Sequence, residues 1–189
     1  MACLGTAPHE QRYVCVWSDK RERMFVNACC KANMDFRGNL ELLDRPKTAF
    51  LASRGILPED VLRCLDWAAA QRDAGRCIIG GFHAPLEKDV LRVLLKGRQP
   101  IVIVLARRHY RRIPEALAPA MQAGRLLLVS VSAAARADAH TTRLRNQYIV
   151  DHCDQVVIGA LDPGGHLADL VASLPKSRRI SLHHAHGDR

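Results

Sequence analysis

The chain has 189 residues, of which 48% are hydrophobic and 25% charged, and it carries a formal net charge of +9. This length and composition suit one globular domain with a buried core rather than a low-complexity chain. No apolar run approaches the roughly 20 residues of a membrane-spanning helix, so we expect no membrane segment. The excess positive charge favours polyanions as partners, above all nucleic acid and nucleotides, with a merely solvated basic surface as the alternative.

The N-terminal sequence MACLGTAPHEQRYVCVW lacks the basic-then-apolar order of a secretory signal, which favours a cytoplasmic protein. The seven cysteines are odd in number and irregularly spaced, so a disulfide framework is not expected. Cys3, Cys15, Cys29 and Cys30 gather near the N-terminus without a Cys-x-x-Cys pair. We therefore predict no zinc site there.

Apolar strand-like runs alternate with helical patterns along most of the chain. In chain order the predicted elements are a strand at Lys47–Ala52, a helix at Pro58–Ala74, a strand at Arg76–Ile79, a helix at Ala84–Lys96, a strand at Pro100–Ala106, a helix at Ile113–Ala123, a strand at Arg125–Val131, a helix at Ala134–Cys153, a strand at Gln155–Ala160, a helix at His166–Leu174 and a weaker strand at Arg178–His183. The first five strands are almost entirely apolar, which is typical of strands buried on both faces.

This alternation predicts an α/β fold with right-handed βαβ units. We expect a Rossmann-like parallel sheet of five or six strands with helices on both faces. The alternation divides the chain into an N-terminal extension at 1–35, a Rossmann-like domain at 36–183 and a polar tail at 184–189. His183, His184 and His186 could together bind a metal, but a polar tail is the favoured interpretation.

Ligands of open parallel sheets bind beyond the carboxyl ends of the strands, so the residues that follow each strand are the candidate site. Glycines let a backbone approach phosphate closely, free N–H groups at a helix start attract the anion, and arginine binds its oxygens. Glycine pairs are also ordinary turns, and the basic run at 107–112 is also explained as a solvated surface. The candidate residues on this edge are Ser53, Arg54, Gly80, Gly81, Phe82, His83, Arg107, Ser130, Gly164 and Gly165.

Three stretches resemble the Rossmann-like domain of the DprA/Smf family of DNA-processing proteins. They are FLASRGILPEDVLRCLDWAAAQRDAGRCIIGGFHAPLEKDVLRVLLKG, GRLLLVS and RLRNQYIVDHCDQVVIGA, the last being similar to the family's R-N-x-x-I…D-x-V-V-V segment. The resemblance spans roughly Thr48 to Leu174 and keeps the order of the elements. It implies a fold that binds a nucleotide or single-stranded DNA, often as a homodimer, and it adds Arg145 and Asn146 to the candidate binding residues.

The chain departs from that family after two strands. The segment 82–86, FHAPL, stands where the family has Ala-Arg-Gly-Ile-Asp, which removes a phosphate-contacting arginine and leaves His83 as a weaker substitute. The segment 162–165, DPGG, stands where the family has a Gly-Ser-Gly turn.

The related LOG-type phosphoribohydrolases carry P-G-G-x-G-T-x-x-E, of which this chain matches only Pro163-Gly164-Gly165. Val171 occupies the glutamate position, and Glu87 is the nearby carboxylate that could replace it. Glu87 is equally explained as a first-turn acid that compensates a helix dipole.

The sequence thus predicts a protein that binds a nucleotide or single-stranded DNA, with a LOG-type hydrolase and a non-catalytic nucleotide sensor as alternatives. No catalytic residue, metal or cofactor is assigned.

Overall fold

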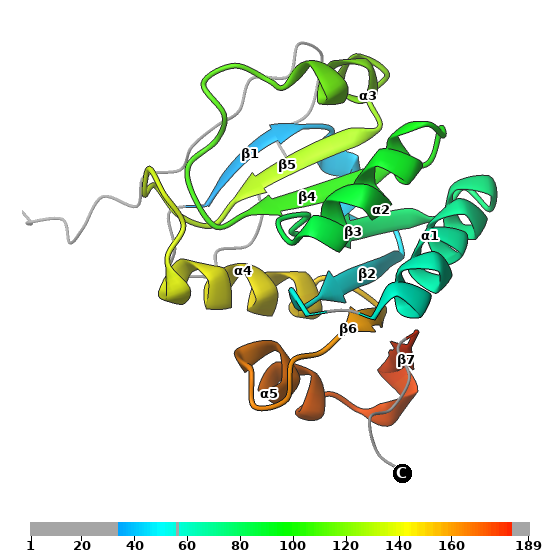
Figure 1. The fold of residues 1–189 in the computed structure, drawn as a ribbon. Coiled ribbons are helices and arrows are strands. Elements are labelled where there is room, and N and C mark those ends of the chain that lie inside the picture. Colours follow the sequence, from blue (N-terminus) through cyan, green and yellow to red (C-terminus); the bar gives the residue numbers. More distant parts are fainter. Residues whose placement is uncertain (1–33, 56, 183–189) are drawn as a thin grey trace, which may run out of the picture.

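A computed structural model describes residues 34–55 and 57–182 of the chain, and its strands and helices alternate in the predicted order (Figure 1). The N-terminal cysteines and most of the predicted extension, together with His183 and the rest of the tail, lie outside the described residues. The elements are β1 (Asp35–Gly38), η1 (Leu40–Leu43), β2 (Lys47–Ala52), α1 (Pro58–Asp73), β3 (Cys77–Gly80), α2 (Pro85–Leu95), β4 (Ile101–Leu105), η2 (Glu115–Leu117), α3 (Ala118–Gln122), β5 (Leu126–Ser130), α4 (Ala139–Asp151), β6 (Gln155–Ala160), α5 (His166–Ala172), η3 (Lys176–Arg178) and β7 (Arg179–Ser181).

The strands form one seven-stranded sheet in the order β1-β5-β4-β3-β2-β6-β7. Strands β2 to β7 are parallel, as predicted, whereas β1 pairs antiparallel with β5. The sequence analysis missed β1 and placed its first residue, Asp35, in the extension. The segment DFRG is short, polar and mostly exposed, as is common for a strand at a sheet edge.

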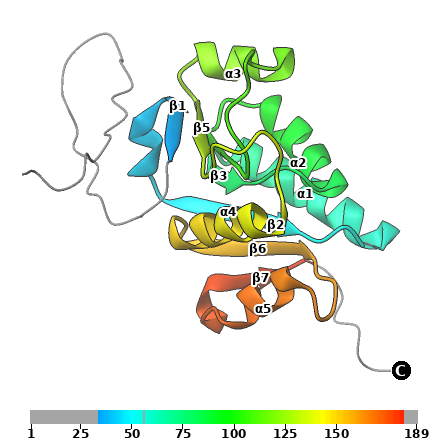
Figure 2. The ribbon, with the colours of Figure 1, turned by 90° about the vertical axis from the view of Figure 1, so that its left-hand side faces the viewer.

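Helices cover both faces of the sheet, which confirms the predicted Rossmann-like class. Alternate residues of each strand point to opposite faces, so Phe50 of β2 belongs to the core that includes residues of α1, α2 and α3, while Ala49 and Leu51 belong to the core that includes residues of α4, α5 and η1. Figure 2 shows α1 and α2 together on one side of the strands. The central strands are buried on both faces, which explains their continuous apolar runs.

Two helices differ from their predicted bounds by more than two residues at one end. Helix α4 begins at Ala139 rather than Ala134, because the Asp138 side chain accepts a hydrogen bond from the Thr141 N–H (2.7 Å) and caps the helix there. The stretch predicted as one helix at Ile113–Ala123 is instead a turn of 3-10 helix followed by α3, which has Pro119 in its first turn.

Candidate functional site

The direction of the chain connections reverses at β2. This strand pairs with β3 on one side and with β6 on the other, so crossovers leave it toward both edges of the sheet. A parallel sheet opens a crevice at the carboxyl ends of such strands. We call this place the corner site; it comprises residues 53–55, 81–84 and 161–165 together with Arg145 of α4.

Hydrogen bonds connect the loops of the corner site to one another. The Ser53 N–H donates to the Ala160 carbonyl (2.9 Å), and the Ser53 hydroxyl accepts a hydrogen bond from the Asp162 N–H (3.0 Å). Ser53 therefore connects the loop after β2 to the loop after β6. The Asp162 carboxylate lies over Gly55, where an added Cβ would be 2.7 Å from Oδ1.

On the other side of the corner site, Glu87 connects the end of β2 to the residues before α2. Its side chain is 2% exposed, and its Oε1 accepts a hydrogen bond from the Ala52 N–H (3.2 Å) at the end of β2. Its Oε2 accepts from the N–H groups of His83 (2.7 Å) and Ala84 (3.1 Å), directly before α2. They stand directly before the helix whose start the sequence analysis expected to attract a phosphate. In the structure the carboxylate of the same chain occupies them.

Arg145 brings a cation to the corner site from α4. The residue is 8% exposed and packs against Gly81, where an added Cβ would be 2.8 Å from Nε and 2.9 Å from Cζ. The Asn146 side-chain oxygen accepts hydrogen bonds from Nε (3.1 Å) and Nη2 (2.8 Å). Within the described residues the Arg145 Nη1 makes no hydrogen bond, and this atom is not fully buried. It is therefore free to bind a ligand.

Burial lowers the pKa of Arg145, and the negative charge of Glu87 opposes that shift. The group nevertheless stays protonated, because a guanidinium keeps its proton at any pH that proteins tolerate. Gly81 thus has a specific role: only a residue without a side chain leaves room for this guanidinium.

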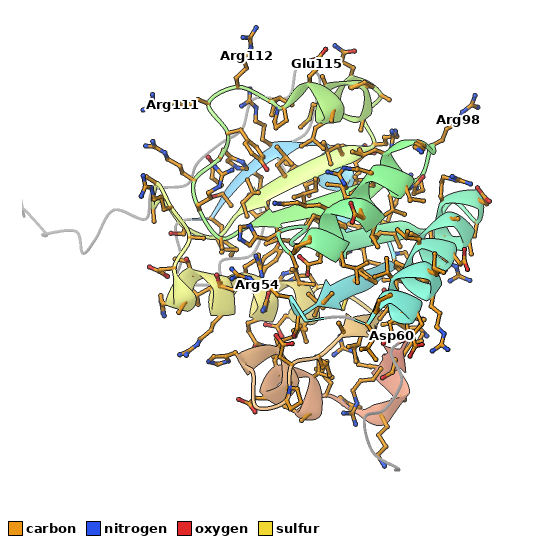
Figure 3. All side chains as sticks on the ribbon, viewed as in Figure 1. Arg54, Asp60, Arg98, Arg111, Arg112 and Glu115 are labelled. Atoms are coloured by element: carbon orange, nitrogen blue, oxygen red, sulfur yellow. The ribbon has the colours of Figure 1, made fainter. Side chains whose placement is uncertain are left out.

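Further positive charges surround His83, which is exposed at the mouth of the corner site. Burial of its ring lowers the pKa of His83, and the charges of Arg145, Lys88 and Arg54 lower it further, whereas Glu87 raises it. These effects favour the neutral form of the imidazole near pH 7, and three of them come from neighbouring cations. Figure 3 shows the exposed Arg54 directly after β2. Lys88, one helical turn into α2, was missed by the sequence analysis, because a lysine on an exposed helix face has no distinctive pattern.

Gly80 and Phe82 shape the floor of the site rather than its surface. Phe82 has a positive φ of 47°, which costs an L-residue about 1–2 kcal/mol, and its ring is 6% exposed. The ring packs against Gly80, where an added Cβ would be 3.0 Å from Cζ. Phe82 is thus a core residue and offers no exposed face on which a base could stack.

Ser130 and Arg107 lie at the ends of β5 and β4, beside the corner site rather than in it. The Ser130 side chain is buried, and its Oγ is hydrogen-bonded to the carbonyls of Arg107 (2.9 Å) and Ser132 (3.0 Å). The Arg107 guanidinium lies over the Tyr110 ring, 4.6 Å from its centroid. Arg107 does not contribute to the lowered pKa of His83, in contrast to Arg145, Lys88 and Arg54.

The remaining two glycines form the turn that follows β6. Gly164 has a φ of +69° and an open environment, and the Gly165 N–H donates to the Asp162 carbonyl (3.1 Å). Helix α5 starts after this turn and has seven residues. The described part of the chain contains no cluster of three His, Cys, Asp or Glu side chains suited to a metal ion. Nor does any of its helices have the length and apolar character needed to cross a membrane.

No family model and no curated protein matches the chain. Solved structures with the same fold do exist. DNA processing protein A (DprA) from Streptococcus pneumoniae is 18% identical, with a TM-score of 0.62 over 78% of this chain and 54% of that one. DprA from Helicobacter pylori, a structure that describes a single-stranded DNA binding mode, is 17% identical, with a TM-score of 0.53 over 66% of this chain and 59% of that one. The molybdenum cofactor binding protein from Rippkaea orientalis is 12% identical, with a TM-score of 0.50 over 72% of this chain and 76% of that one.

The chain therefore has the Rossmann-like fold of DprA, in agreement with the resemblance seen in its sequence. It spans only between half and three fifths of the length of these DprA structures.

Proposed function

We propose that the corner site binds the phosphate groups of single-stranded DNA or of a nucleotide. The observation that carries this proposal is the position of Arg145, a buried guanidinium that lies against Gly81 and keeps Nη1 free. A cation fixed by packing and by Asn146 loses little side-chain entropy when it binds an anion, so its contact is more favourable than that of a mobile surface residue.

The charges around Arg145 support the same ligand. Arg54 and Lys88 act on His83 together with Arg145, which gives three positive charges against the single negative charge of Glu87. Glu87 is also fully occupied by backbone N–H groups, so the site keeps an excess of positive charge toward solvent. The net charge of +9 adds a general attraction for polyanions.

The Helicobacter pylori structure with a single-stranded DNA binding mode shares the fold and supports DNA as the ligand. We place the DNA strand along the carboxyl ends of β2, β3 and β6, with one phosphate at Arg145 and a neighbouring one at Arg54. A nucleotide would use the same two arginines. A nucleotide sensor and a DNA-binding protein therefore differ here in the extent of the ligand rather than in the position of its phosphate.

A LOG-type hydrolase gains no support from the geometry. Glu87, the carboxylate that could replace the missing glutamate, is 2% exposed and accepts three backbone hydrogen bonds. A general acid must reach its substrate within hydrogen-bonding distance, and this carboxylate is directed at the backbone of its own chain.

The proposal is tested by fluorescence anisotropy with a labelled oligothymidine and a panel of nucleotides, each titrated at two salt concentrations. We expect DNA affinity to fall steeply with salt, with a slope of about 0.7 per phosphate contact for a single strand. Arg54→Ala should lower the affinity and reduce the slope by roughly one contact. Arg145→Lys should weaken binding while keeping the charge, because lysine lacks the planar fork.

Arg143→Ala is the matched control for both variants. It removes one arginine from an exposed position of α4, the helix that also holds Arg145. Nucleotide binding without DNA affinity at low salt would end the DNA part of the proposal and leave the nucleotide sensor. Failure of both ligands, or equal losses in Arg54→Ala and Arg143→Ala, would refute the corner site itself.

A further inference from the structure

A second basic concavity lies at the opposite edge of the sheet. An open cavity of about 720 Å³ is bordered by Gly75, Gly97 and Gly124, the residues that follow the ends of α1, α2 and α3. We call it the amino-edge cavity, because it lies where β3, β4 and β5 begin. Figure 3 shows Arg98 of this cavity at the other end of the sheet from Arg54 of the corner site.

The lining of the amino-edge cavity is strongly basic. Its charged residues are Arg45, Arg72, Asp73, Lys96, Arg98 and Arg125. Five cations thus face one carboxylate. Helices α1, α2 and α3 all end here, and a helix C-terminus carries a partial negative charge of about one half. Some positive charge is therefore expected on structural grounds alone.

Two of the five cations have internal partners that account for them. The Arg72 Nε donates to the Asp73 carboxylate (2.8 Å), which raises the pKa of Arg72. Arg125 donates from Nη2 to the Leu95 carbonyl (2.9 Å) and from Nη1 to the Gln99 carbonyl (3.3 Å), so it satisfies the end of α2. These contacts explain both arginines without any ligand.

The other three cations have no side-chain partner, although Lys96 and Arg98 stand at the C-terminal end of α2, where positive charge compensates the helix dipole. The side chains of Arg45, Lys96 and Arg98 are exposed, and none makes a hydrogen bond or an ion pair within residues 34–55 and 57–182. Three like charges around one concavity repel each other, which is unfavourable for the fold. An anion bound between them would remove that repulsion.

The cavity wall also contains an unsatisfied acceptor. Gln99 is 2% exposed and donates from its side-chain nitrogen to the Leu94 carbonyl (2.6 Å), while its Oε1 lacks a partner in the described structure. Gly97 lies so close that any Cβ there would collide with Gln99 and with the Arg72 side chain. This oxygen is itself buried beside Gly97, so a ligand in the open cavity does not reach it.

We propose that the amino-edge cavity is a second binding site, for a phosphate-bearing small molecule of nucleotide size. Arg45, Lys96 and Arg98 hold its phosphate oxygens, and the open cavity of about 720 Å³ that they line has room for it. This inference does not depend on the corner site, because the two sites share no residue.

Isothermal titration of the full chain with inorganic pyrophosphate and with ADP tests the proposal. We expect both to bind, and the triple variant Arg45→Ala/Lys96→Ala/Arg98→Ala to weaken the binding at the amino-edge cavity about tenfold or more while leaving any binding at the corner site, since three charge-assisted contacts are lost. The control variant Arg136→Ala/Arg143→Ala/Lys176→Ala removes the same charge from exposed positions that do not line the cavity. It should bind as tightly as the parent.

Amide chemical shifts in the titration locate the ligand independently of the variants. Shifts at Gly75, Gly97 and Gly124 are the expected result. Binding that the triple variant leaves unchanged, or shifts confined to the corner site around Gly81, would overturn the proposal. That second result would leave the corner site intact, so the two hypotheses fail separately.

Discussion

Glu87→Gln tests whether the buried carboxylate holds the corner site together or performs chemistry. The substitution keeps the size of the side chain but leaves one acceptor oxygen where there were two. If that oxygen keeps the N–H groups of His83 and Ala84, the new amide N–H₂ must face the Ala52 N–H, donor against donor. One hydrogen bond to a charged group is lost, worth about 1.5–3 kcal/mol, and a buried N–H is left unpaired.

We therefore expect Glu87→Gln to lower the free energy of unfolding by roughly 3 kcal/mol, given those values for one lost bond and one unpaired donor. For a domain of this size, that corresponds to a fall in Tm of about 6–12 °C. Denaturation followed by circular dichroism measures both quantities. Glu115→Gln is the control: Glu115 is an exposed first-turn acid (Figure 3), and its loss should change stability by no more than about 0.5 kcal/mol. Stability equal to the parent's in Glu87→Gln would refute the structural role assigned to this carboxylate.

Four further predictions concern individual side chains of the fold and the corner site. Gly81→Ala should displace the Arg145 guanidinium and weaken oligothymidine binding in the anisotropy assay. His83 has a lowered pKa in the folded chain, so the unfolded state binds its proton more readily and stability should fall as pH drops through about 6.5. A bound phosphate favours protonated His83, so affinity should rise over the same pH interval, and His83→Gln should abolish that rise. Burial raises the pKa of Cys64 to about 11, so peptide mapping after alkylation at pH 8 should find this thiol unmodified until the protein unfolds.

The accuracy of the sequence analysis followed the strength of the local signal. The strands Lys47–Ala52 and Gln155–Ala160 were predicted with their observed bounds, because each is a mostly apolar run and has a neighbouring strand on both sides. Strand β1 was missed because pairing with β5, rather than its own composition, makes it a strand. The intrinsic β-propensity of the residues has little influence on whether a short exposed edge segment forms a strand.

The candidate site depended more on contacts that no local pattern encodes. The first-turn position of Glu87 indicated its interaction with the start of α2, but its bond to Ala52 joins residues 35 positions apart. Arg145 entered the analysis only through the resemblance to DprA/Smf proteins, and its packing against Gly81 requires the crossover from β5 to β6. Sequence reasoning also could not show that Phe82 is buried, since its positive φ turns the ring inward toward Gly80.

The role of Glu87 changes how the corner site must attract an anion. In many Rossmann-like folds a glycine-rich loop offers backbone N–H groups at a helix start, and the helix dipole adds to their attraction. Here the carboxylate of Glu87 occupies the N–H groups before α2 and opposes that dipole. The attraction for phosphate must then come from the guanidinium groups of Arg145 and Arg54. A site that depends on backbone groups survives most side-chain substitutions, whereas this one should lose most of its affinity when either arginine is replaced.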